Sequence, residues 1–490
     1  MLKTMIKKWR LVSLLIIVAL AVLLLPVNSY AAQAIQVNIN GKPATLSSAQ
    51  PYILKNVVML PVKAISEALG ANVTWDADNN NVIIRRGNNI SILKKNSSKV
   101  YVNGKAFSLL AASTVKNGSI YVPQDFITDV FGFQIAYNKT TAKFSITIKD
   151  FPLYYSKKFR IKYLDNGCKL VTDGENYRIL LVPRGKTAPK GVVADKTVYI
   201  PLQKVMTGSS TYVGAMAKLN VLDSLKAVTT SANYWYIPKV KQMVSQGKVK
   251  YVGGDNMEAQ DYELVKSINP ELVFVYTGTT GQQHVMRKLS ELGIRYAVNN
   301  EYLEPDCLGR LEWIKFTAAF YDKELEAEKI LNNAVKNINT VTARVAGLKK
   351  PKVAWGLSWA GKIYITNPGS YVGKWINMCG GDYAFKNHGT NADTQVSAEY
   401  FYAQAKEADI FIFSSTTNYM KSPTINQIVK ENPLFANIKA VKNGNVWAYA
   451  PDWWQTIPET DVFVKDIAAA FHPGAFSGYK PVKLVKLPRS

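Results

Sequence analysis

From about residue 195 onward, short apolar segments alternate with segments of helical pattern, and one long amphipathic stretch at 322–347 interrupts the alternation. Its apolar residues recur at helical spacing: Ala327, Ile330, Leu331, Ala334, Ile338, Val341 and Val345. Alternating strands and helices are typical of a parallel sheet covered by helices. The sequence therefore predicts an α/β fold with two Rossmann-like lobes, 195–320 and 351–490, joined by one long helix over 321–350.

The segment before the lobes has a different pattern, because residues 35–150 repeat themselves. "VVMLPVKAISEALGANVTW" corresponds to "SIYVPQDFITDVFGFQIAY", so that Pro61 and Gly70 recur as Pro123 and Gly132. Each unit reads as strands around an Asn-Gly turn, then a Pro-started helix with a Gly stop. We expect a duplicated small α+β stalk module here, followed by a β-hairpin lead-in over 151–194.

The amino terminus has the pattern of an export signal. Basic residues precede an apolar run at 11–25, and small residues follow it. The run is shorter than the roughly 20 residues that a spanning helix needs. We therefore expect residues 1–34 to be a signal peptide and the protein to be extracellular and associated with the cell envelope. An uncleaved N-terminal anchor stays open as the alternative.

Charge and motifs exclude several classes of function. The formal net charge of +25 is spread along the chain, and nucleic acid is not an expected partner of an exported protein. The chain has only three histidines, no Gly-x-Ser-x-Gly, no His-Glu-x-x-His and no Gly-rich phosphate loop. The three cysteines have no metal-ligand spacing. The sequence thus predicts neither an enzyme nor a resident metal or cofactor.

Two helix-strand units resemble each other in the two lobes. "DYELVKSINPELVFVY" begins at a capping residue, Asp261, with Glu263 two positions later, and "SAEYFYAQAKEADIFIF" places Ser397 and Glu399 in the same way. A carboxylate in the first turn of a helix is stabilised by the helix dipole. Each glutamate alone is therefore explained as an ordinary helix-start residue.

Together these segments resemble two known families. Residues 35–150 are similar to the copper amine oxidase N-terminal-like domain, a secreted stalk-type module, and residues 195–475 to class III periplasmic-binding-type receptors of ABC importers. The second resemblance implies an extracellular receptor that delivers an iron-siderophore chelate or a corrinoid to a membrane permease, with haem as another candidate ligand. It also implies that Glu263 and Glu399 dock on arginines of the permease. The alternative is a structural or adhesive wall protein whose receptor-like fold binds no ligand.

The ligand site is expected in the cleft between the lobes, where loops after the strand ends meet. Such clefts need aromatic walls with few polar groups. The candidates are Tyr234, Trp235, Tyr236, Tyr276, Trp359, Trp453 and Trp454. No basic cluster stands out in these loops, which favours a large, weakly charged chelate or a corrinoid. The stalk is interpreted as a spacer or a contact to cell-wall polymer, or else as a duplicated domain without a separate role.

Overall fold

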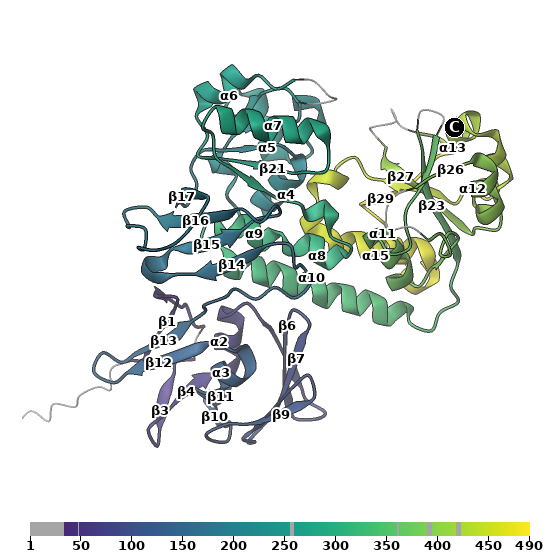
Figure 1. The fold of residues 1–490 in the computed structure, drawn as a ribbon. Helices are drawn as coiled ribbons and strands as arrows, with labels where there is room; N and C mark the ends of the chain where they lie inside the picture. The colour runs from purple at the N-terminus through teal and green to yellow at the C-terminus, as the bar shows by residue number, and fades with distance from the viewer. Residues whose placement is uncertain (1–33, 48, 255–258, 360–361, 390–393, 418–422) are drawn as a thin grey trace, which may run out of the picture.

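The structure is a computed structural model that describes residues 34–490, except 48, 255–258, 360–361, 390–393 and 418–422. The expected signal peptide lies outside the described residues. Within the described ranges, no helix is both long enough and apolar enough to cross a membrane. The predicted fold class is confirmed: two α/β lobes are joined by one long helix and preceded by a sheet-rich module (Figure 1).

The stalk, residues 34–150, is built from two interlocked repeats. Strand β1 of the first repeat pairs in parallel with β13 of the second, and β4 pairs with β11. The repeats therefore share their sheets. The elements of the stalk are β1 (Gln36–Ile39), β2 (Lys42–Pro43), β3 (Tyr52–Leu54), β4 (Val57–Pro61), α2 (Val62–Ala68), β5 (Asn72–Asp76), β6 (Asn81–Arg86), β7 (Asn89–Lys94), β8 (Lys99–Val102), β9 (Lys105–Ser108), β10 (Thr114–Lys116), β11 (Ser119–Pro123), α3 (Phe126–Phe131), β12 (Gln134–Asn138) and β13 (Lys143–Thr147).

The lead-in forms a four-stranded sheet that extends into the following segment. Its strands are β14 (Arg160–Tyr163), β15 (Lys169–Thr172), β16 (Arg178–Pro183) and β17 (Lys196–Ile200), in that spatial order. Strand β17, which the sequence assigns to lobe 1, instead completes this sheet by pairing in parallel with β16. The Lys196 ammonium lies over the Tyr296 ring, 3.5 Å from its centroid, and so ties the lead-in to lobe 1.

Lobe 1 is a parallel five-stranded sheet in the order β20-β19-β18-β21-β22. Strand β21, with the sequence LVFV, is buried along its whole length, as expected for a central parallel strand. The elements are β18 (Val205–Thr207), α4 (Ser210–Lys218), β19 (Leu225–Val228), the 3-10 turn η3 (Ala232–Tyr234), α5 (Pro238–Ser245), β20 (Lys250–Tyr251), α6 (Tyr262–Ile268), β21 (Leu272–Val275), α7 (Thr280–Glu291), β22 (Tyr296–Val298) and η5 (Glu301–Leu303).

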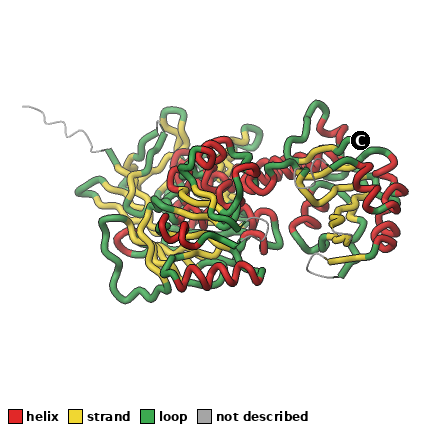
Figure 2. Tube along the Cα trace, turned by 90° about the horizontal axis from the view of Figure 1, so that it is seen from above, coloured by secondary structure: helices red, strands yellow, loops and turns green. Residues whose placement is uncertain are grey.

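Helix α10 (Glu324–Val345) is the spine between the lobes, reached from lobe 1 through α8 (Cys307–Glu312) and α9 (Ile314–Ala319). Six of the seven residues of the predicted apolar stripe are buried: Ala327, Leu331, Ala334, Ile338, Val341 and Val345. Figure 2 shows lobe 2 set apart from the rest of the molecule, at the far end of this helical connection.

Lobe 2 has a mixed seven-stranded sheet in which β23, β27 and β28 are parallel. Its elements are β23 (Lys352–Trp359), β24 (Lys362–Ile365), α11 (Tyr371–Met378), β25 (Asp382–Tyr383), β26 (Thr394–Val396), α12 (Ala398–Ala405), β27 (Ile410–Thr416), α13 (Ile425–Glu431), α14 (Lys439–Lys442), β28 (Val446–Tyr449), η7 (Trp453–Gln455), η8 (Ile457–Glu459), α15 (Thr460–Phe471) and β29 (Leu484–Lys486).

The stalk is docked on the spine by a buried ion network. Glu328 of α10 pairs with Arg86 of the stalk at 3.2 Å and with Lys315 of α9 at 2.6 Å, and all three side chains are almost completely buried. Asn332, one turn further along, accepts from the Gly87 N–H and donates to the Gly70 carbonyl at 2.7 Å. We call this contact the spine joint.

One apolar core runs through the spine joint. A single cluster of buried side chains extends from Ile35 in the stalk through Ile161 in the lead-in to Phe320 beside lobe 1, whereas lobe 2 has a core of its own. The stalk, the lead-in and lobe 1 are therefore packed as one body on the spine.

The charge on Glu328 should be essential to the spine joint. Burial raises its pKa, but the attraction of Lys315 and Arg86 outweighs burial and holds the pKa below its ordinary value. Glu328→Gln leaves the buried Arg86 without its anion, while Lys315 keeps its second partner, Glu312, at 2.8 Å, and the variant should lower the free energy of unfolding in urea by about 3–5 kcal/mol. Because the pKa is depressed, this stabilisation is complete above the unfolded-state value of about 4.3 and is lost as the pH falls through the folded-state value.

The matched control is Glu326→Gln on the same helix, where the side chain is 55% exposed. This variant should change the unfolding free energy by less than about 0.5 kcal/mol. Equal, small losses in the two variants would show that the buried network does not hold the joint.

Candidate functional site

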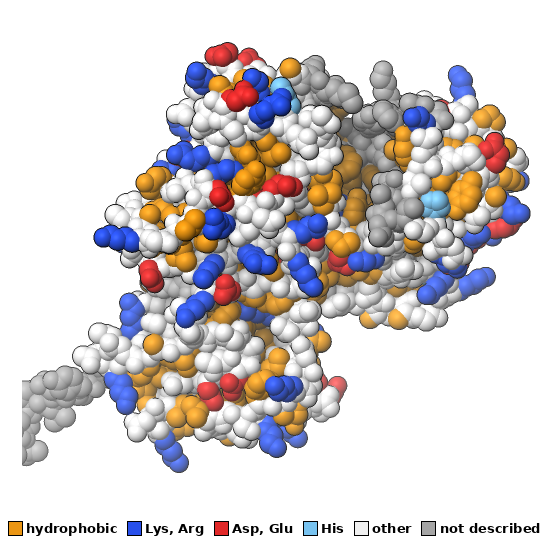
Figure 3. All heavy atoms as spheres, viewed as in Figure 1, with side chains coloured by type: hydrophobic (Ala, Val, Ile, Leu, Met, Phe, Trp, Pro, Cys, Tyr) orange, Lys and Arg blue, Asp and Glu red, His pale blue; other side chains and the backbone are white. Residues whose placement is uncertain are grey.

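The two lobes face each other across a hollow whose wall carries hydrophobic side chains (Figure 3). In α/β sheets, ligands bind at the carboxyl ends of the strands, where the loops leave the sheet. In lobe 1 those loops follow β18, β19, β21 and β22, and in lobe 2 they follow β23, β27 and β28. These strand ends define the candidate site.

On lobe 1, two tyrosines stand together after β21 and β22. The rings of Tyr276 and Tyr302 are 6.0 Å apart and meet edge to face, and the Tyr302 hydroxyl donates to the carbonyl of Thr277. Burial raises the pKa of both phenols, so both stay neutral donors at physiological pH. Tyr276 was predicted from the sequence and Tyr302 was not, although Tyr302 lies only four residues after β22, where a strand-end rule could have found it.

A second cluster is built by a lobe 2 segment that reaches across to lobe 1. The Gln455 carboxamide accepts from the N–H groups of Tyr236 and Ile237, at 2.9 and 3.2 Å, and donates to the Tyr234 carbonyl at 2.6 Å. Gly214 of α4 lies so close to the Gln455 backbone that a side chain there would collide with it. The 3-10 turn η7 thus fixes the aromatic loop that follows β19.

The floor of the hollow holds a charge pair that touches both lobes. Arg310 is buried, pairs with Glu301 at 2.7 Å, and lies over the Tyr371 ring of lobe 2, 4.4 Å from its centroid. The positive charge of Arg310 is therefore engaged within the protein.

The structure separates the predicted aromatic residues into two groups. Tyr234, Tyr236 and Trp454 are 42%, 37% and 47% exposed and can present their rings to a ligand. Trp235 and Trp453 are 1% exposed. The Trp453 ring packs 4.1 Å from the ring of Phe463, centroid to centroid.

Trp235 and Trp453 are thus corrected to core residues in this conformation, because consecutive side chains point in different directions: Tyr234, Tyr236 and Trp454 are exposed while the tryptophans beside them are buried. Trp359 ends β23, and its side chain lies outside the described part of the structure. For Tyr234, Tyr236, Tyr276, Trp359 and Trp454, ligand binding stays a prediction.

Glu263 and Glu399 occupy matching positions in the two lobes. Each is the second residue of a helix whose preceding cap side chain, Asp261 or Ser397, accepts a backbone N–H at the third position. Both carboxylates are exposed. Hydrogen bonds from its own backbone N–H and from the Ser397 hydroxyl hold the pKa of Glu399 below its usual range. Both side chains are therefore available to a partner, on helices α6 and α12 of opposite lobes (Figure 1).

The described residues contain no group of three or more His, Cys, Asp or Glu side chains that could hold a metal ion. The cysteines at 168, 307 and 379 are free and buried.

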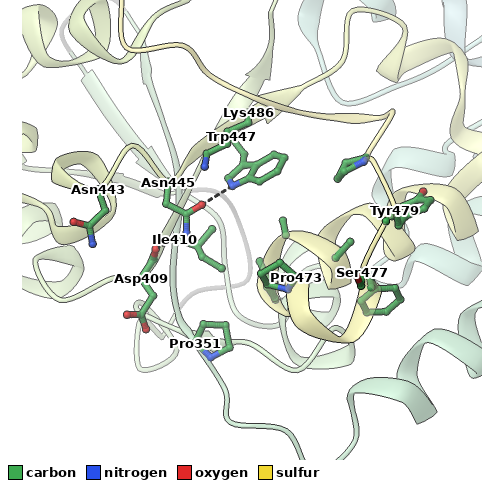
Figure 4. A pocket seen from close by; sticks show the side chains of 16 residues that line it. Pro351, Asp409, Ile410, Asn443, Asn445, Trp447, Pro473, Ser477, Tyr479 and Lys486 are labelled. Atoms are coloured by element: carbon green, nitrogen blue, oxygen red, sulfur yellow. Dashed lines mark hydrogen bonds between the residues drawn. The ribbon is translucent and has the colours of Figure 1, made fainter.

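A separate hollow lies on lobe 2 at the amino ends of the strands (Figure 4). Asp409 and Asn445, which precede β27 and β28, line it together with Trp447, whose indole N–H donates to the Asn445 side chain at 2.9 Å. This hollow is on the opposite edge of the sheet from the candidate site, and we do not assign it a ligand.

Comparison with known proteins gives two family matches. Residues 38–146 match the copper amine oxidase N-terminal domain, and residues 205–452, just over half of the chain, match the periplasmic binding protein family. An uncharacterized lipoprotein of Methanocaldococcus jannaschii, MJ0878, is 29% identical over 86% of this chain and 93% of its own length.

More distant similarities lie in the receptor part of the chain. The Fe(3+)-citrate-binding protein YfmC of Bacillus subtilis is 24% identical over 46% of this chain and 69% of its own. The crystal structure of Helicobacter pylori Ceue with Ni(II) bound aligns with a TM-score of 0.46 at 23% identity, covering 60% of this chain and 92% of that chain. The family match extends through both lobes and the spine, and the chain belongs to the periplasmic binding protein family.

Proposed function

We propose that this protein is the extracellular receptor of an ABC importer, which captures an iron chelate or a corrinoid between its lobes and delivers it to a membrane permease. The observation that carries the proposal is the arrangement of exposed aromatic rings and neutral phenols at the strand ends that face the hollow. Flat aromatic walls suit large ligands with apolar surfaces.

The ligand class is supported by a relative, YfmC, which is named as a binder of ferric citrate. A receptor of this kind acts outside the cell membrane, so the proposal places the protein in the cell envelope, with its permease as partner. Haem, which like a corrinoid is a planar ring that holds a metal ion, is a further candidate ligand.

Native mass spectrometry tests the proposal directly. The exported protein is mixed with a ferric siderophore, cyanocobalamin and haem in competition, and the mass of the bound species identifies the ligand. One chelate should stay bound in a 1:1 complex. A protein that binds none of them would favour the alternative function, a structural or adhesive wall protein.

The two neighbouring tryptophans should affect different properties: Trp453 the stability of the fold, and Trp454 the affinity for the ligand. Trp453→Ala removes a buried ring and should lower the unfolding free energy by about 3–5 kcal/mol. Trp454→Ala removes an exposed ring and should leave stability within about 0.5 kcal/mol of wild type, while weakening binding of the captured chelate by about 1–3 kcal/mol in a titration followed by fluorescence. Unchanged affinity in Trp454→Ala would remove this residue from the site.

The paired glutamates should matter for delivery and not for capture. Two separated carboxylates that pair with permease arginines would set the orientation of the receptor. Replacing both Glu263 and Glu399 by Ala should leave the melting temperature and chelate affinity nearly unchanged, while abolishing co-purification with the permease and uptake.

The control replaces Glu291 and Glu407, one exposed carboxylate in each lobe, by Ala. This second variant removes the same charge and should support full uptake. If both double variants transport equally well, Glu263 and Glu399 serve only their helices.

A further inference from the structure

The lead-in sheet extends to the strand ends of lobe 1. The turn between β15 and β16, residues 173–177, lies against β22: the Gly174 N–H donates to the Val298 carbonyl at 3.0 Å, and the Val298 N–H donates to the Asp173 carboxylate at 2.9 Å. The other oxygen of Asp173 accepts from the N–H groups of Glu175 and Tyr177, both at 3.0 Å. The turn is therefore held in one shape at the carboxyl edge of the lobe.

This turn places one carboxylate beside the candidate site. An oxygen of Glu175 accepts from the Thr277 hydroxyl at 2.8 Å and from the Asn300 carboxamide at 3.2 Å. Thr277 and Asn300 lie two residues after the ends of β21 and β22, and Thr277 also accepts from Tyr302 through its carbonyl. Glu175 thus belongs to the same cluster as the tyrosine pair, and the residue is exposed.

The loops around this cluster lack the basic residues that give the rest of the protein its positive charge. The loops after β18, β19 and β21, residues 208–210, 229–237 and 276–280, contain neither Lys nor Arg, although the chain as a whole carries +25. The nearby guanidinium of Arg310 is neutralised by Glu301. Lys196 lies over the Tyr177 ring of this turn, 4.2 Å from its centroid, but none of the described residues forms an ion pair with Glu175, so this carboxylate adds a negative charge to the edge.

We propose that the lead-in supplies an acidic wall to the ligand site through Glu175, and that the site selects a neutral or cationic chelate with hydrogen-bond donors over an anionic one. The inference rests on the proposed receptor function. A carboxylate attracts cations and accepts from amide or hydroxyl donors, and it repels the carboxylates or catecholates of an anionic ferric complex. Residues 151–194 thereby gain a role in ligand choice.

Three probes of different charge test this proposal with the full-length protein. They are ferrioxamine B, whose iron complex is cationic; cyanocobalamin, which is neutral and rich in amides; and ferric citrate, which is anionic. Titration calorimetry should show that wild type binds ferrioxamine B or cyanocobalamin at least about tenfold more tightly than ferric citrate, because one local charge changes binding by about this factor.

Variants at Glu175 test whether this carboxylate causes the preference. Glu175→Gln keeps an acceptor for Thr277 and Asn300 and removes only the charge, so it should reduce the preference several-fold. Glu175→Lys should reverse the preference, so that ferric citrate binds more tightly than the cationic probe. The control is Asp165→Asn, which removes an exposed carboxylate from the turn at the other end of β15 and should alter each affinity less than about twofold. Melting temperatures show whether each variant is folded.

The outcomes separate the two proposals. If wild type binds ferric citrate most tightly, the acidic wall is wrong while the receptor function stands. If the preference is present but unchanged in both Glu175 variants, Glu175 does not form the wall. If wild type binds none of the three probes or haem, the receptor function fails and the inference fails with it.

Discussion

The architecture depends on one buried carboxylate at the middle of the molecule. Glu328 lies on the spine helix and holds Arg86 of the stalk and Lys315 of α9 in a place from which water is excluded. A buried cation without a partner costs several kcal/mol, so Arg86 depends on Glu328, and Lys315 is shared between Glu328 and a second buried carboxylate, Glu312, at 2.8 Å. The ion network therefore requires the stalk, the helix below lobe 1 and the spine to keep one arrangement.

Because of this constraint, the stalk is packed against the rest of the protein and is not a flexible tether. The apolar core is continuous from the stalk through the lead-in into lobe 1, and lobe 2 has a separate core at the other end of α10. Lobe 2 contacts lobe 1 through few elements, chiefly the turn that carries Gln455 and the pair of Arg310 with Tyr371. A salt bridge of 3.1 Å between Lys218 of α4 and Glu459 of η8 adds to this contact, so lobe 2 has a core of its own and joins lobe 1 through a small set of contacts.

Local patterns predicted the fold well. The spacing of apolar residues in 322–347 predicted the spine, and six of the seven predicted stripe residues are buried, while the cap residues Asp261 and Ser397 predicted two helix starts. The spine joint could not be predicted in this way, because Arg86 and Glu328 are far apart in the chain and only the folded structure brings them together. The assignment of β17 to lobe 1 was wrong for the same reason, because the residue pattern of a strand does not show which other strand it pairs with.

The candidate site could be predicted only to the level of loops. Strand ends pointed to loops at the carboxyl edges of the two sheets, but a loop residue has no periodicity that tells whether its ring is exposed or buried, and so the buried Trp453 and Trp235 were assigned to the site. Glu175 was missed because its position beside Thr277 depends on a turn of the lead-in that meets lobe 1. Both failures concern contacts between segments, which sequence patterns do not encode.

Because the stalk and lobe 1 share one apolar core, we expect them to keep one arrangement when a ligand binds, and lobe 2 to move relative to them. Spin labels at exposed positions test it: Lys63→Cys in the stalk, Lys266→Cys in lobe 1 and Ala403→Cys in lobe 2. Pairwise distances are measured by pulsed electron resonance with and without the chelate retained in native mass spectrometry. We expect a narrow distance between stalk and lobe 1 that the chelate does not change, and a distance between lobes 1 and 2 that the chelate narrows. A broad or ligand-dependent distance between stalk and lobe 1 would contradict this account.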